Sequence, residues 1–247
     1  MTSLLGGSSR MPELVSQSLA ETVAAAAGQA ERHDPVRPHT GGPAGNALLT
    51  AWVGLGLLVL FFAEGLTLLD VRGLIDWHVA LGALLIPPAL VKTASTGWRI
   101  VRYYTGNPDY QRAGPPPLIL RLLGPLVVAS TLALLATGVV LVVIGQDASY
   151  QPLLSPLGFP IDWVALHKAA FVVWLVATGL HVLGRTLPAA RLAVGRAGSA
   201  GRVPGTWLRV AVVALLLATA TLAAVLLVQA DASWHALPSW YTGHGDG

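Results

Sequence analysis

The chain has 247 residues, of which 54% are hydrophobic and only 11% carry a formal charge. Soluble domains average about 25% charged residues, so this composition excludes a soluble globular enzyme, and the abundance of Leu and Val excludes a disordered chain. The net charge of +3 is no indication of nucleic-acid binding, and the absence of cysteine excludes disulfides, cysteine zinc sites and thiolate iron–sulfur clusters. We therefore expect a polytopic membrane protein whose main partner is the lipid bilayer.

The N-terminal tail, residues 1–46, is expected to hold a short amphipathic helix over 11–32 followed by a linker over 33–45. We expect no signal peptide, because the first long apolar run starts only near Ala47. A transmembrane domain over 47–230 and a C-terminal tail over 231–247 complete the predicted organisation.

The transmembrane domain contains five apolar runs, each close to the roughly 20 residues that cross a bilayer as an α-helix. They span residues 47–69, 77–95, 122–145, 163–184 and 207–228. The alternation typical of membrane β-barrel strands is not seen. The predicted fold is all-α, with five membrane-spanning helices; that the first four form a four-helix bundle, with the fifth as an extra C-terminal helix, is implied by the family resemblance given below.

The arginines predict the orientation. The loops after the first and third runs and the segment after the fifth run are expected on the same side of the membrane. Of the 13 arginines, only Arg72 lies in these segments. The other twelve lie in the N-terminal tail, in residues 97–121 or in residues 185–209. Since positively charged loops stay in the cytoplasm, we expect the N-terminus inside and the C-terminus outside.

Three histidines, His78, His167 and His181, fall within predicted helices, where an unsatisfied polar side chain is costly. His167 and His181 are 14 residues apart, about 3.9 helical turns, which places them on nearly one face about 21 Å apart in depth. His78 is expected at the outer depth of His167, since both stand near the start of helices that run in the same direction. Counting 14 residues from His78 reaches Lys92, which therefore lies at the level of His181.

Small residues on the first and third helices follow the same spacing. Gly124 and Gly138 are 14 residues apart on the third helix, and Gly65 lies 14 residues after Ala51 on the first, with Gly54 nearby. A flat porphyrin needs small residues where it meets neighbouring helices, although small residues are common at membrane helix contacts in general.

This arrangement resembles the bacterial membrane-bound b-type cytochromes, in the dihaem four-helix form of the respiratory cytochrome b. The resemblance rests on the segments DWHVALGALLIPPALVK (76–92) and DWVALHKAAFVVWLVATGLHVLGR (162–185), and it covers residues 47–185 by spacing and topology. Members of that family carry two histidines on each of the second and fourth helices and glycines on the other two. This sequence departs from the pattern at Lys92, which stands where the fourth histidine should be.

The resemblance implies a haem-b electron-transfer subunit between the quinone pool and a redox partner, in the bacterial cytoplasmic membrane. His78 and His167 would ligate an outer haem, and His181 an inner one, with Lys92 as the positional candidate for its second ligand. Gly54, Gly65, Gly124 and Gly138 would pack against the haems, and Arg99, Arg102 and Arg121 could contact propionates. The chain carries no catalytic module of its own, so catalysis is expected on another subunit or at a quinone pocket. A redox partner on the external face could dock on the C-terminal tail.

Each of these residues also has an ordinary explanation. The histidines could be interhelical hydrogen bonders in a haem-free, structural or accessory five-helix subunit. Lys92 could extend to the headgroups as a cation, and the arginines could serve only to set the topology. Glu64 could take up protons at a quinol site or be a satisfied interfacial carboxylate. The tail histidines, including His235, are expected to be solvated. The residues alone are compatible with one bound haem or with two.

Overall fold

The computed structural model describes residues 42–111, 118–195 and 204–236, together with positions 13, 16–17, 19–21 and 23–24, which are helical. Most of the expected 11–32 helix, Arg112 in the loop after the second helix, and the C-terminal tail beyond residue 236 lie outside the described residues.

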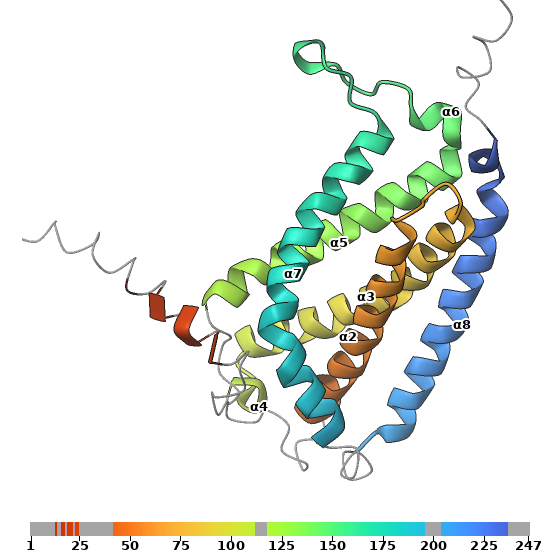
Figure 1. Cartoon of the computed structure of the whole chain (residues 1–247). Helices are drawn as coiled ribbons and strands as arrows, with labels where there is room; N and C mark the ends of the chain where they lie inside the picture. The colour runs from red at the N-terminus through yellow and green to blue at the C-terminus, as the bar shows by residue number, and fades with distance from the viewer. Residues whose placement is uncertain are drawn as a thin grey trace, which may run out of the picture. The chain divides into compact units, whose positions relative to one another are not determined.

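Five long helices account for most of the described chain (Figure 1). They are α2 (Gly42–Thr67), α3 (Ile75–Tyr104), α5 (Leu118–Ile144), α7 (Trp163–Gly195) and α8 (Thr206–Ala230). All five are long and apolar enough to cross a membrane. The described residues contain no β-strand beyond one isolated bridge between Leu154 and Ile161. The predicted all-α membrane fold with five spanning helices is confirmed.

The helix boundaries follow from local sequence. Pro43, near the first position of α2, has no N–H to leave unsatisfied. The helix α5 ends at Gly145, whose φ of 80° is accessible to glycine at little cost. Two prolines, Pro87 and Pro88, lie inside α3, where each removes a backbone hydrogen bond; spanning helices tolerate this because neighbouring groups satisfy the freed carbonyls.

All five helices are longer than their apolar runs, and two of them continue far beyond the C-terminal end of the run. The α3 helix continues to Tyr104 rather than ending near residue 95, and α7 continues to Gly195 rather than 184. Arg99 and Arg102 therefore lie on the last turns of α3 and not in a loop. Arg209, which the fifth apolar run already includes, lies in the first turn of α8 and is only 6% exposed. An apolar window ends at the first charges, whereas the backbone hydrogen bonds of a helix continue through them.

The chain contacts divide the molecule into two compact units. The first contains residues 1–55, 94–128 and 176–206, and the second contains residues 56–93, 129–175 and 207–247. In the first unit, a polar group joins α2 to α3. Asn46 donates from Nδ2 to the backbone carbonyl of Ser95 at 3.2 Å, and the Ser95 hydroxyl donates to Asn46 Oδ1 at 2.6 Å. Thr50 completes the group through a short hydroxyl contact with Ser95.

In the second unit, the segment after α8 packs against the end of α5. This segment includes a 3₁₀ turn, η3 (Ala232–His235), and it lies beside α6 (Gln146–Ser149). The indole nitrogen of Trp234 donates to the Leu141 carbonyl at 3.2 Å, and the backbone N–H of Gln146 donates to the Ser233 hydroxyl, also at 3.2 Å. With its side-chain amide turned so that the nitrogen faces these carbonyls, Gln146 also donates to Ser233 and Ala236 at 3.0 Å each. These bonds fix the position of η3.

Candidate functional site

Two of the three helical histidines face each other in the second unit. His78, from the first turn of α3, and His167, from the second turn of α7, have ring centroids 6.4 Å apart and ring planes at 88°. Both side chains are half-buried. The structure thus brings together two residues that are 89 positions apart in the sequence.

The Nδ1 atom of His78 is held from the end of α2. It lies 2.9 Å from the Thr67 hydroxyl and 2.9 Å from Glu64 Oε1. The Thr67 hydroxyl has its own acceptor, because it donates to the backbone carbonyl of Glu64 at 2.6 Å. Its proton is therefore engaged, so His78 Nδ1–H is the donor in these contacts.

His167 is held in the same way from α5. Its Nδ1 lies 3.0 Å from the Thr137 hydroxyl. That hydroxyl donates along its own helix to the carbonyls of Ala133 and Leu134, at 2.8 and 3.0 Å. The threonine oxygen is thus an acceptor for His167 Nδ1–H, just as Thr67 is for His78.

The shared tautomer leaves the Nε2 lone pair of each ring as the position for a metal. Metal-bound histidines usually donate their other ring N–H to an oxygen in this way, which fixes the ring and raises its basicity. Imidazole nitrogens bind transition-metal ions at about 2.0–2.1 Å, so two imidazoles on opposite sides of one ion have centroids roughly 6 Å apart. The 6.4 Å separation matches that arrangement. The residues present fit a bis-histidine haem iron.

The glycines differ in their surroundings. A Cβ atom at Gly138 would lie 3.3 Å from His167 Cε1, so this glycine is what lets the ring approach α5. A Cβ at Gly65 or at Gly124 would meet nothing within 4 Å, which leaves open space beside both positions. Gly54 is half-buried on α2. Their predicted role in packing against a haem stays a prediction.

The residues predicted for an inner haem are found on the expected helices. His181 lies on α7 in the first unit, and Lys92 on α3 in the second; both are half-buried, and each has an interaction partner. Their ligation of one iron stays a prediction.

The structure shows the neighbours of the three arginines that were predicted as propionate contacts. The Arg102 guanidinium lies 5.6 Å from the centre of the Trp98 ring, at cation–π distance. Arg99 is half-buried, Arg121 is exposed, and both have interaction partners of their own. All three belong to the first unit, whereas the His78–His167 pair belongs to the second.

Glu64 is more than an interfacial carboxylate. One oxygen pairs with His78, while the other, Oε2, is buried and has no hydrogen-bond partner among the described residues. Gly82 lies close by, since a Cβ there would be 3.7 Å from Glu64 Oε1.

Trp174 is a buried side chain between the levels of His167 and His181 on α7. It packs against Phe61, with ring centroids 4.5 Å apart.

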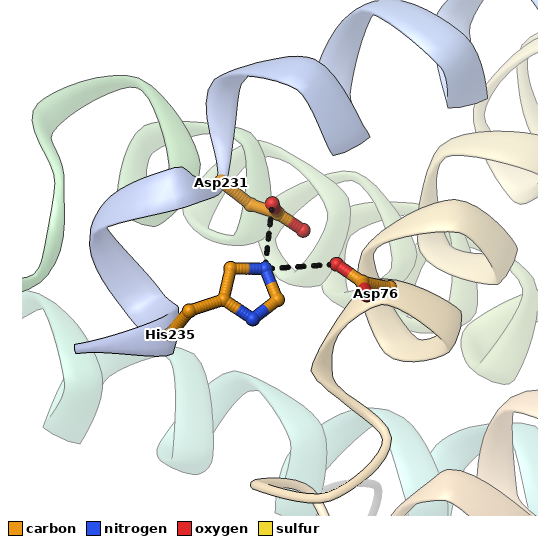
Figure 2. A group of neighbouring side chains, drawn as sticks. All are labelled: Asp76, Asp231 and His235. Atoms are coloured by element: carbon orange, nitrogen blue, oxygen red, sulfur yellow. Dashed lines mark hydrogen bonds and ion pairs between the residues drawn. The ribbon is translucent and has the colours of Figure 1, made fainter.

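A second group of side chains lies where α3 begins and α8 ends (Figure 2). His235 Nε2 is 2.9 Å from Asp76 Oδ1 and 3.3 Å from Asp231 Oδ1. Burial raises the pKa of the Asp231 carboxyl above its ordinary value; the hydrogen bond from His235 opposes this, and the Asp76 charge adds to it. His235 is exposed, as expected for a histidine of the tail, and it is also paired with these two carboxylates.

Sequence reasoning missed Thr67, Thr137 and this second group. A threonine within a membrane helix most often bonds to its own backbone, as Thr219 does here, so nothing in the sequence indicated that Thr67 and Thr137 would contact the two histidines. Asp76 and Asp231 are 155 residues apart, and only the fold brings them together.

Comparison of the chain with family models, with curated proteins and with solved structures finds no match.

Proposed function

We propose that the protein is a haem-b electron-transfer subunit of a membrane oxidoreductase. The observation that carries the proposal is the His78–His167 pair, in which two facing imidazoles have the same tautomer because each Nδ1–H meets a threonine oxygen. A hydrogen-bonding role alone would not require both rings to have the same tautomer, with the Nε2 lone pair left for a metal. The resemblance to the four-helix b-type cytochromes supports the same function.

In this proposal each residue has a distinct task. His78 and His167 would hold the haem iron through their Nε2 atoms, and the two threonines would hold the rings in place and raise their basicity. When bound, the haem supplies reversible one-electron transfer, and two histidine ligands leave no open position for oxygen. Gly138 keeps α5 close to His167. Lys92 and His181 would serve a second haem, and the proposal holds with one haem or with two.

Two further parts of the proposal concern the group that exchanges protons and the protein that exchanges electrons with the haem. Glu64, with one buried oxygen that lacks a partner among the described residues, is suited to exchange protons at a quinol pocket. The redox partner would be a protein at the end of the spans near His78 and the C-terminal tail. The competing function is a haem-free structural subunit, in which the same histidines only join helices.

An optical spectrum with a haem assay tests the proposal. We expect membranes that contain the full chain to show the reduced bands of b-type haem, and the purified protein to hold one or two haems per chain. A ratio near two would support ligation at His181 and Lys92, and a ratio near one would restrict the site to His78 and His167. A colourless protein, purified after expression with ample haem, would favour the haem-free subunit.

We propose further that the N-terminus is cytoplasmic, in a bacterial inner membrane, because twelve of 13 arginines lie on one side of the predicted spans. A phosphatase that folds only outside the cytoplasm should be active when fused after Gly247, and a fluorescent protein that folds only in the cytoplasm should be dark there. Fusions after Tyr110 should give the reverse pattern. Fluorescence at Gly247 together with an inactive phosphatase would invert the orientation.

Thr137→Val should weaken haem binding and raise the midpoint potential of the haem held by His167. The change keeps the side-chain shape but removes the acceptor of His167 Nδ1–H, so the ring becomes less basic and stabilises ferric iron less. Loss of such a partner typically costs about 10–100-fold in metal affinity. A redox titration monitored optically measures the potential. Thr221→Val is the matched control, because Thr221 bonds only to its own helix; equal shifts in both variants would contradict the assignment.

A further inference from the structure

The group Asp76, Asp231 and His235 has the composition of a metal site outside the proposed haem level. Each residue offers one ligand atom, and these atoms all lie within 4.8 Å of one another. Two ligands on a tetrahedral zinc ion, each at about 2.0–2.2 Å, stand roughly 3.3 Å apart. The two measured contacts of His235 Nε2, 2.9 and 3.3 Å, are close to that spacing.

A buried oxygen provides an independent indication. Asp231 is only 1% exposed, and its Oδ2 atom has no hydrogen-bond partner among the described residues. In Figure 2, the second Asp231 oxygen points to the side of the group where Asp76 lies. A buried carboxylate oxygen without a donor is costly, and a cation beside it would remove that cost.

The surroundings hold the group in position and favour positive charge. Asp231 directly follows α8, and the carbonyls at a helix C-terminus attract cations. His235 is placed by η3, which Trp234 and Ser233 bind to the α5–α6 region. Asp76, in the first turn of α3, is more than half exposed, with 56% of its side chain open to solvent, which gives an ion a route of entry.

We propose that Asp76, Asp231 and His235 bind a divalent transition-metal ion of the zinc type. Two carboxylates and one imidazole leave a fourth position for water, and the two negative charges balance the ion. The ion would displace the present hydrogen bonds of His235 Nε2, with its nitrogen lone pair turned to the metal. Its role is structural: it joins the end of α8 to the start of α3, two residues before His78. The site does not depend on haem.

Zinc binding to the full chain tests this proposal. The protein is purified in detergent with a tag that contains no histidine, stripped with a chelator, and dialysed against a zinc buffer. We expect one zinc per chain by elemental analysis and a higher temperature of helix unfolding by circular dichroism with zinc than without it. Asp231→Asn and Asp76→Asn, which keep the side-chain shape, and His235→Ala should each lower zinc affinity about tenfold or more.

His33→Ala is the matched control and should bind zinc as the wild type does. The unfolding curve without zinc shows whether each variant is folded, and Asp76→Asn, at an exposed position, keeps the test valid if Asp231→Asn is unstable. Absence of zinc from the wild type overturns the proposal. It is also overturned if His235→Ala alone loses zinc while both asparagine variants retain full affinity, because that pattern indicates adventitious binding by a single histidine.

Discussion

Replacing His167 with alanine is expected to remove one b-type haem component from the spectrum completely, while the protein still inserts into the membrane. The substitution deletes one of the two nitrogens proposed to hold the haem iron and leaves Thr137 with no ring to hold. His78→Ala should have the same effect, because both rings are proposed to hold the same iron. The double variant should be no worse than either single one, since residues that act as a unit are not additive. Difference spectra of membranes and the haem content of the purified variants measure the loss.

Lys168→Ala is the control for this experiment. Lys168 is adjacent to His167 but its side chain is exposed, so its removal should leave the spectrum unchanged. If both histidine variants keep the wild-type spectrum at wild-type protein levels, the two residues are only interhelical partners, and the haem function must be abandoned or placed elsewhere.

The second large effect is expected at Gly138, a residue that contacts no iron. Gly138→Val should reduce haem content nearly as far as His167→Ala does. A Cβ there already lies 3.3 Å from His167 Cε1, and the two methyl groups of valine would press the ring away from α5. Overpacking of this kind costs about 1–3 kcal/mol, and the displaced ring would lose its 6.4 Å centroid separation from His78. Gly138→Ala should retain part of the haem, since the ring needs to move only slightly.

Gly179→Val provides the comparison. Gly179 is also a helix-interior glycine, but a Cβ there meets nothing within 4 Å, so the variant should keep its haem. Normal haem content in Gly138→Val would show that the His167 ring can move without loss of ligation, or that it ligates nothing. Protein yield and helix content, measured beside haem, separate misfolding from a specific loss.

The fold could be predicted well from the sequence because the bilayer imposes a strict length on apolar helices. All five spans were located, and the errors lie at their ends, where α3 and α7 continue beyond the apolar runs to Tyr104 and Gly195. Hydropathy responds to the first charged side chain, while a helix ends where its backbone hydrogen bonds end. Arg209 shows a different limit: the fifth apolar run includes it, but the sequence contains no sign that its side chain is buried.

The candidate site was predicted in part. Helical spacing was enough to place His78 and His167 at one level, because depth in a spanning helix is proportional to residue number. Spacing contains no information on which atoms a ring nitrogen contacts, so the hydrogen bonds of Thr67 and Thr137 with the two histidines could not be predicted from the sequence. The pairing of Asp76 with His235 could not be predicted either. The C-terminal tail shows no periodicity, and its path back to α3 is determined by the tertiary contacts of η3.

The hydrogen bonds of the two histidines also bear on the order in which the molecule is assembled. His78 is bound by residues 11 and 14 positions before it, and His167 by a residue 30 positions before it. Each half of the site is thus complete within a single helical hairpin, α2 with α3 and α5 with α7, and contacts between near sequence neighbours form early. We expect each hairpin to orient its own histidine soon after leaving the ribosome, before the two hairpins meet. In the proposed haem function, cofactor capture would then be the last step of biogenesis, and two separately synthesised fragments divided between Gln111 and Leu118 should be able to complete it.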